Sequence, residues 1–440
     1  MSAATARELA SSLAAAASGA LSADDRGRTR LWPGPVTWRQ PVHTVYVPAD
    51  RFHARLAREW GDEGLATWRA HCGGASGVAD LLRAAGFDGA TEIEGRDIAD
   101  RVEAKLAQEP IEDLRIDFED GFTQRGVAPE DRWDHEDATL AAVLGALAAE
   151  GRPAPFWGIR FGSFDPATRD RGIHTLTGFL LGLHEAGLTV TARELRLTFP
   201  KVTSEEQVRE LVHVLGAIEA TAAPRGVPAD RIRHGFEIQV ETPQSILAAD
   251  GTSPLPGMIT AGDGRVLSLH YGTYDYSAFL GVAAADQAMD HPVADHAKDV
   301  MQAAVAGRGV EMSDGSTNRL PLGDADAIRE AWALHARLVG RHLTRGIWQG
   351  WDLHANQLPT RFAATYAWFR RRTPDALERL DRYLAGRDGA VADEPATAKA
   401  MAGFLGRAVD CGAVTAEELD ATTGLDRAQL TELTRNGALP

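Results

Sequence analysis

The chain has 440 residues and a formal net charge of -16, from 46 Lys and Arg against 62 Asp and Glu. A general nucleic-acid binder needs the opposite sign, because neutralising phosphates supplies most of the affinity in such complexes. Hydrophobic residues make up 44% and charged residues 25%, which are ordinary values for a soluble globular protein. No stretch approaches about 18 consecutive apolar residues, so we expect no membrane span.

The two cysteines and the N-terminal segment predict a cytoplasmic protein. Cys72 and Cys411 cannot make a disulfide framework or a cysteine metal cage, and we expect both as reduced thiols. Residues 1–21 are rich in alanine but lack a basic start, and Arg7 and Glu8 interrupt their apolar run. This segment predicts an amphipathic surface helix rather than a signal peptide.

Short apolar runs alternate with longer helical patterns along the chain. The runs that predict strands are residues 43–48, 114–118, 156–161, 195–200, 235–240 and 266–271, with two weaker runs at 310–312 and 347–353. The stretches that predict helices between them are residues 139–150, 175–186, 204–220 and 325–343. Strands separated by helices favour a parallel sheet, and eight strands fit a closed barrel better than an open doubly wound sheet.

Proline-rich points divide the chain at residues 32–35 and 373–374. We predict an N-terminal helical extension at residues 1–40, a barrel at 41–372 and a C-terminal helical segment at 373–440. The predicted fold class is therefore α/β, a (β/α)8 TIM barrel with an N-terminal extension and a C-terminal helical tail.

Polar residues follow the ends of successive predicted strands. In a β/α barrel these ends meet at one rim, where active sites are built. Glu241 and Asp275 follow the fifth and sixth strands and form the best pair of metal ligands. Two carboxylates with room for several waters suit Mg²⁺. The competing interpretation is that each carboxylate caps a helix or pairs with an arginine.

A second acidic cluster, Asp117, Glu119 and Asp120, ends the second predicted strand. Burying three acids within four residues is costly unless a cation or hydrogen-bond donors satisfy them. The alternative is a solvated loop, which the flanking apolar residues disfavour. Arg160 ends the third strand. We expect it to form either a bidentate pair with a substrate carboxylate or a salt bridge to Glu119 or Asp120.

These blocks together resemble the superfamily of HpcH/HpaI-type 2-oxo-acid aldolases, citrate lyase β-subunits, malyl-CoA lyases and malate synthases. The resemblance runs over residues 44–358 and is that of a divergent branch of these pyruvate-type barrels. The blocks that carry it are Asp117-Phe-Glu-Asp120, Ile159-Arg160, Phe199-Pro-Lys-Val202, Gln239-Val-Glu241-Thr, Gly272-Thr-Tyr-Asp275 and Leu353-His-Ala-Asn-Gln357.

The resemblance implies a metal-dependent carbon–carbon lyase, or the reverse condensation. The cofactor would be Mg²⁺ or Mn²⁺, held by Glu241 and Asp275. It would chelate a 2-oxo acid such as pyruvate, oxaloacetate or glyoxylate and stabilise an enolate. An acyl-CoA as second substrate stays open, and we expect a homo-oligomer without nucleic-acid or membrane partners.

Four further residues are catalytic by this resemblance: Arg160, Glu119, Asp120 and Gln239. Arg160 would neutralise the substrate carboxylate, and Gln239 would hydrogen-bond near the metal-bound oxygens. Glu119 and Asp120 would hold metal-bound water. Hydroxy-acid aldolases carry a histidine base where this chain has Asp120, so we expect poor cleavage of simple hydroxy-oxo acids. The missing base is expected from the tail, as in related enzymes that take an acid from a C-terminal segment or a neighbouring subunit; the candidates are Asp381, Asp388, Asp393 and Asp410.

Two other functions stay open. Lys201, one of only four lysines, follows the fourth predicted strand and could be the nucleophile of a Schiff-base aldolase. A catalytically silent barrel that acts as a binding module is the third hypothesis, which the intact acidic set disfavours. The run Arg370-Arg-Arg372 could contact phosphates, but it more simply predicts a solvated helix end.

Overall fold

The computed structural model describes residues 3–188, 191, 193–222, 232–387 and 394–439. Eight parallel strands form one sheet in the order β7-β6-β5-β4-β3-β2-β1-β8. The strands are β1 (His43–Pro48), β2 (Asp113–Asp117), β3 (Phe156–Arg160), β4 (Arg196–Phe199), β5 (Gly235–Val240), β6 (Val266–Tyr271), β7 (Glu311–Ser313) and β8 (Gly350–Asp352). The two outer strands meet where Ser313 pairs with Gln349 in parallel, so the predicted TIM barrel is confirmed.

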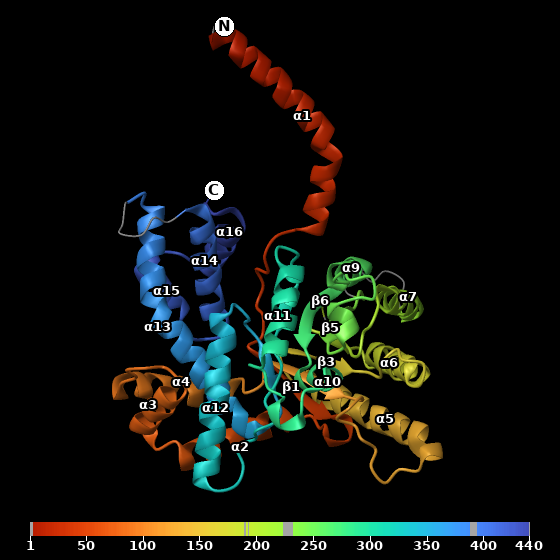
Figure 1. The fold of residues 1–440 in the computed structure, drawn as a ribbon. Helices are drawn as coiled ribbons and strands as arrows, with labels where there is room; N and C mark the ends of the chain where they lie inside the picture. Colours follow the sequence, from red (N-terminus) through yellow and green to blue (C-terminus); the bar gives the residue numbers. More distant parts are fainter. Residues whose placement is uncertain (1–2, 189–190, 192, 223–231, 388–393, 440) are drawn as a thin grey trace.

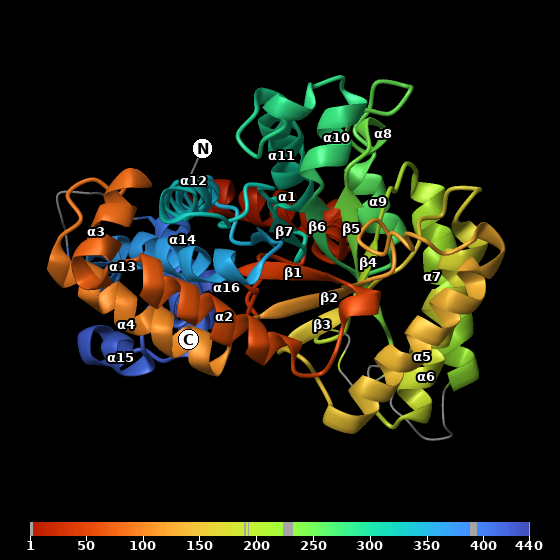
Figure 2. The same cartoon turned by 90° about the horizontal axis from the view of Figure 1, so that it is seen from below.

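Helices connect the strands and cover the barrel. They are α1 (Ala3–Leu31), α2 (Leu56–His71), α3 (Gly74–Ala84), α4 (Glu92–Gln108), α5 (Arg132–Glu150), α6 (Arg169–Glu185), α7 (Glu205–Ala222), α8 (Pro243–Ile246), α9 (Leu255–Ala261), α10 (Thr273–Phe279), α11 (Pro292–Val305), α12 (Ala325–Thr344), α13 (Leu358–Leu384), α14 (Pro395–Asp410), α15 (Ala416–Thr423) and α16 (Arg427–Asn436). Figure 2 shows α5, α6 and α7 along one side of the strands and α2, α3, α4 and α13 along the other.

The barrel interior holds a layer of buried charges beneath the rim. Arg115 on β2 donates to Asp113 at 2.9 Å and to Glu237 on β5 at 2.9 Å, and its Nε donates to Thr198 on β4 at 2.8 Å. All of these side chains are buried. Breaking one partner of such a buried set costs several kcal/mol, about 3–5, so the layer ties β2, β4 and β5 together below the site.

The two ends of the chain behave differently. Figure 1 shows α1 extending away from the body of the molecule, and Leu9, Leu13 and Leu21 on it are exposed. At the other end, α13 continues through Thr373 and Pro374, where the sequence predicted a new segment to begin. Its last turns pack with α14, α15 and α16 around a second apolar cluster. The division of the chain into three parts stays a prediction.

Among the residues that the structure describes, no helix is both long enough and apolar enough to cross a membrane. Both cysteines have free thiols and are buried. Burial raises the pKa of the Cys72 thiol to about 12, so this cysteine is an inert part of the core.

Candidate active site

Glu241 lies directly after β5, and its carboxylate is fully buried. One carboxylate oxygen accepts from the Lys201 backbone N–H at 2.7 Å, and the other accepts from Nε2 of Gln239. Lys201 has φ +52°, in the left-handed region that non-glycine residues rarely adopt. That backbone turn directs the Lys201 N–H at Glu241, so strand ends β4 and β5 fix the carboxylate from two sides.

Gly272 lies against Glu241 at the end of β6. A Cβ on Gly272 would lie 2.5 Å from the Glu241 Cβ and 2.9 Å from its Oε2. Its φ of -94° is open to any residue, so this position needs glycine for space rather than for backbone freedom. The close approach brings Asp275, in the first turn of α10, to the same part of the rim as Glu241.

The site carries excess negative charge. The pKa of Glu241 is raised to about 8, first by burial and then by the charges of Glu119 and Asp275, against which Lys201 and Arg160 act. A divalent cation would compensate this charge, so the side chains fit a metal. Within the part of the chain that the structure describes, no three His, Cys, Asp or Glu side chains gather closely enough to hold a metal alone. Two carboxylates plus water and substrate oxygens suit Mg²⁺ or Mn²⁺ rather than tetrahedral zinc.

Arg160 is held by Asp117, its neighbour in the parallel register of β2 and β3. Its Nε donates to Asp117 at 2.7 Å and its Nη2 at 2.5 Å. The predicted fork is therefore occupied by Asp117 and is not open for a substrate carboxylate. The remaining nitrogen, Nη1, donates to Oε1 of Gln239 at 3.3 Å and lies 3.4 Å from Glu119. The sequence predicted the salt bridge to Glu119 as an alternative, but not the stronger pair with Asp117.

Glu119 and Asp120 are separated by burial. The Glu119 side chain is 11% exposed and that of Asp120 is 53% exposed, so one acid faces the site and the other faces solvent. The Lys201 ammonium bridges them, at 2.5 Å from Glu119 and 2.7 Å from Asp120. Burial raises the pKa of Glu119 and Asp120 raises it further. Burial also acts to raise the pKa of Asp120, but the hydrogen bond and the charge of Lys201 outweigh burial, so this pKa is lowered.

The expectation of a base from the tail of the same chain disagrees with the packing. Asp410 pairs with Arg427 at 2.7 Å, and Arg427 donates to the carbonyl of Thr37, which precedes the start of β1. The tail thus lies at the amino ends of the strands, opposite the rim. Asp381, on α13, pairs with Arg387 in the turn that follows this helix. Asp388 and Asp393, the other two candidates, lie outside the described residues.

Two rim residues escaped the sequence analysis. Tyr46 lies inside β1, two residues before its end, with its ring 4.9 Å from the Arg160 guanidinium. Asp314 follows β7, is buried, and accepts two bonds from the buried Lys298 at 3.0 Å. The weak predicted strand at residues 310–312 is followed by a serine and Asp314, so the same search for polar residues after strand ends could have found it.

Comparisons with known proteins agree with the fold. A search of curated proteins finds no significant match. A citrate lyase from Burkholderia xenovorans LB400 is a similar solved structure, with TM-score 0.54 and 18% identity over 87% of this chain and 96% of that one. This likeness confirms the predicted resemblance at the level of the fold.

Two other solved structures are more distant. A Haloferax volcanii malate synthase in a lead(II) complex has TM-score 0.47 and 13% identity, over 79% of this chain and 85% of that one. A citrate lyase beta subunit from M. tuberculosis, complexed with oxaloacetate and magnesium, has TM-score 0.39 and 15% identity, over 76% of this chain and 99% of that one. The model of the family described as Domain of unknown function (DUF6986) matches residues 4–437. The chain therefore belongs to the DUF6986 family.

Proposed function

We propose that this protein is a divalent-metal-dependent carbon–carbon lyase, or catalyses the reverse condensation, at the carbon next to the keto group of a 2-oxo acid. The observation that carries the proposal is one connected set at the rim: Arg160 donates to Gln239, and Gln239 donates to the buried Glu241. Asp275 adds a second carboxylate whose charge acts on Glu241. A set that pairs an excess of carboxylates with one buried guanidinium suits a cation and an anionic substrate together.

Glu241 and Asp275 would hold the Mg²⁺ or Mn²⁺ ion. When bound, the ion would polarise the keto oxygen of the 2-oxo acid and so favour an enolate. Gln239 serves both partners: its amide nitrogen orients the Glu241 carboxylate, and its carbonyl accepts from Arg160. These two bonds fix the orientation of the Gln239 amide. In the flipped orientation its NH₂ group would face the N–H donor of Arg160.

Arg160 supplies the positive charge for the developing negative charge on the substrate. Asp117 takes the Nε and Nη2 edge, so only Nη1 is directed toward Gln239 and Glu119. We propose that Nη1 donates to a single oxygen of the substrate rather than forming a bidentate pair. Because Asp117 holds the guanidinium before substrate arrives, little reorganisation is needed during the reaction.

Proton transfer falls to Glu119 in this proposal. Glu119 is largely buried beside Arg160 and Lys201, and its pKa is raised, whereas that of the exposed Asp120 is lowered. Two neighbouring carboxyl groups with diverging pKa values divide into a proton carrier and a permanent anion. Lys201 then positions Glu119 and is not the nucleophile. Burial lowers the pKa of Lys201, but the charges of Glu119 and Glu241 and the hydrogen bonds to Asp120 and Glu119 outweigh it, so the pKa is raised, the opposite of what a nucleophilic amine needs.

The proposed enzyme is cytoplasmic and homo-oligomeric, and acyl-CoA remains a candidate second substrate. The test is a screen of 2-oxo acids with added Mg²⁺ or Mn²⁺, with and without acyl-CoA, read by release of pyruvate, glyoxylate or free CoA. Turnover should need the metal and stop with EDTA. It should disappear in Glu241→Gln and persist in Glu330→Gln, an exposed control with the same change.

Three outcomes would contradict the proposal. Turnover that survives EDTA would remove the metal from the mechanism. Borohydride trapping of substrate on wild-type protein, lost in Lys201→Met, would instead support the Schiff-base alternative. Metal binding without turnover of any 2-oxo acid would favour the silent barrel.

A further inference from the structure

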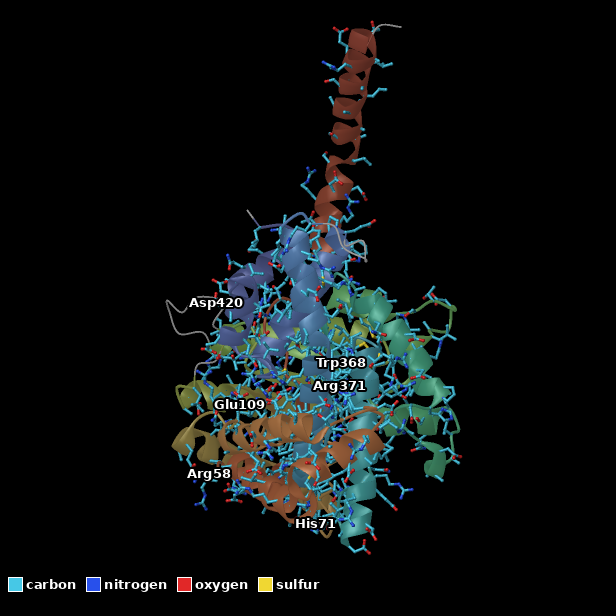
Figure 3. The ribbon with its side chains drawn as sticks, turned by 90° about the vertical axis from the view of Figure 1, so that its left-hand side faces the viewer. Arg58, His71, Glu109, Trp368, Arg371 and Asp420 are labelled. Atoms are coloured by element: carbon cyan, nitrogen blue, oxygen red, sulfur yellow. The ribbon has the colours of Figure 1, made fainter. Side chains whose placement is uncertain are left out.

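An arginine-rich cleft of about 830 Å³ opens on the flank of the molecule, between α12, α13 and the turn after α3. Five arginines line it: Arg337, Arg341, Arg345, Arg371 and Arg372. Figure 3 faces this flank, with Trp368 and Arg371 labelled next to each other on α13. Five guanidinium groups around one cleft stand out in a chain whose net charge is -16.

The arginines form two facing rows. Arg337 and Arg341 lie on α12 and Arg345 is its C-cap residue; their four-residue spacing puts them on one helix face. Eight residues of helix rise by roughly 12 Å, so this row is longer than one phosphate group. Arg371 and Arg372 line the cleft from α13.

Most of these arginines are paired, but one is not. Arg337 pairs with Asp290, and Arg341 pairs with Asp295. Arg345 pairs with Asp295 and Asp299, and Arg371 pairs with Glu94. Arg372 has no carboxylate partner among the described residues; its guanidinium lies 4.3 Å from the centre of the Trp368 ring and donates to a backbone carbonyl. Burial and the charge of Arg371 lower the pKa of Arg372. An anion beside Arg372 would therefore relieve an unbalanced positive charge.

This cleft is separate from the candidate active site. Arg341 and Arg345 lie in the last turns of α12 and its C-terminal cap, and the chain then enters the amino end of β8 at Gly350. Glu241 and Asp275 follow the carboxyl ends of β5 and β6. None of the residues that line the cleft is among Arg160, Gln239, Glu241 and Asp275, so the two sites are built from different residues.

We propose that this cleft binds a small molecule that carries at least two phosphate groups. A guanidinium matches phosphate oxygens with paired N–H bonds, and Arg372 offers one that no carboxylate of the described residues holds. The arginines of the α12 row add positive charge to the same cleft. Because the α12 row is longer than one phosphate group, a second phosphate would reach a further arginine of the row. The cleft volume falls within the range of small-molecule sites. The proposal does not depend on the reaction at the rim.

The test is calorimetric titration of the full chain with pyrophosphate, tripolyphosphate, ATP and orthophosphate, in EDTA so that no metal bridges the ligand. We expect one pyrophosphate per chain, and orthophosphate at least tenfold weaker. The double variant Arg337→Gln/Arg372→Gln should bind pyrophosphate at least tenfold more weakly. Arg329→Gln removes an exposed charge from the same helix outside the cleft and should bind like wild type.

Each other outcome would overturn the proposal. Wild-type affinity in the double variant would place the anion elsewhere, and so would displacement of pyrophosphate by a saturating 2-oxo acid. Equal affinity for orthophosphate would refute the need for two phosphates. Binding of ATP alone would show recognition of the nucleoside. If circular dichroism shows that the double variant does not fold, the single variants replace it. Arg372→Gln should then bind pyrophosphate more weakly than both the wild type and Arg372→Lys.

Discussion

Replacing Gly272 by alanine tests whether Glu241 must keep its exact place. The new Cβ would lie 2.5 Å from the Glu241 Cβ, whereas carbon atoms in contact prefer about 3.5–4.0 Å, so Glu241 must move by about 1 Å. The backbone at Gly272, φ -94° and ψ 94°, accommodates alanine, so the clash is the only new cost. Misplacement by about 1 Å in an active site can cost about 100-fold in rate, and overpacking costs about 1–3 kcal/mol of stability.

The assay is Mn²⁺ affinity by electron paramagnetic resonance, together with kcat/KM and a urea melt. Gly272→Ala should bind Mn²⁺ at least tenfold more weakly while its circular dichroism stays that of the wild type. Gly216→Ala is the matched control: it lies inside α7, and a Cβ there meets no described atom within 4 Å. It should leave metal binding unchanged and stabilise the protein by about 0.5–1 kcal/mol. Wild-type Mn²⁺ affinity in Gly272→Ala would refute Glu241 as a positioned ligand.

Two further predictions concern Arg160 and His342. Arg160→Lys keeps the charge but cannot bond Asp117 twice and Gln239 as well, so kcat/KM should fall at least about tenfold, or about 1.4 kcal/mol; unchanged kinetics would remove Arg160 from the site. Burial and the charge of Arg361 lower the pKa of His342 from 6.5 to about 3. Since the unfolded chain protonates this histidine first, stability should fall as pH drops through that window. His342→Asn should flatten this dependence in urea melts between roughly pH 7 and pH 5, and an unchanged slope would contradict the assignment.

The strands could be predicted because each is a short apolar run between helical patterns. The predicted bounds of the first, fifth and sixth strands match β1, β5 and β6. The rim followed from the same pattern, since parallel strands end together. Arg160, Gln239 and Glu241 are indeed linked by hydrogen bonds. Their catalytic and metal-binding roles stay predictions.

What the sequence could not show depends on register and on long-range packing. Asp117 meets Arg160 because β2 and β3 pair residue for residue at that point, and a predicted strand shifted by one residue hides such a neighbour. The helical pattern of the tail predicted helices but not the end of the barrel they pack against. That position depends on the contact between Arg427 and Thr37, 390 residues apart.

Metal binding at the rim is the central claim, and one measurement tests it most directly. The Mn²⁺ stoichiometry and affinity are measured by electron paramagnetic resonance for wild type, Glu241→Gln, Asp275→Asn and the exposed control Glu330→Gln. We predict one Mn²⁺ per chain in the wild type and the control, at least tenfold weaker binding in the two rim variants, and a change of the spectrum when a 2-oxo acid is added. Wild-type affinity in both rim variants would contradict the metal site and, with it, the proposed chemistry.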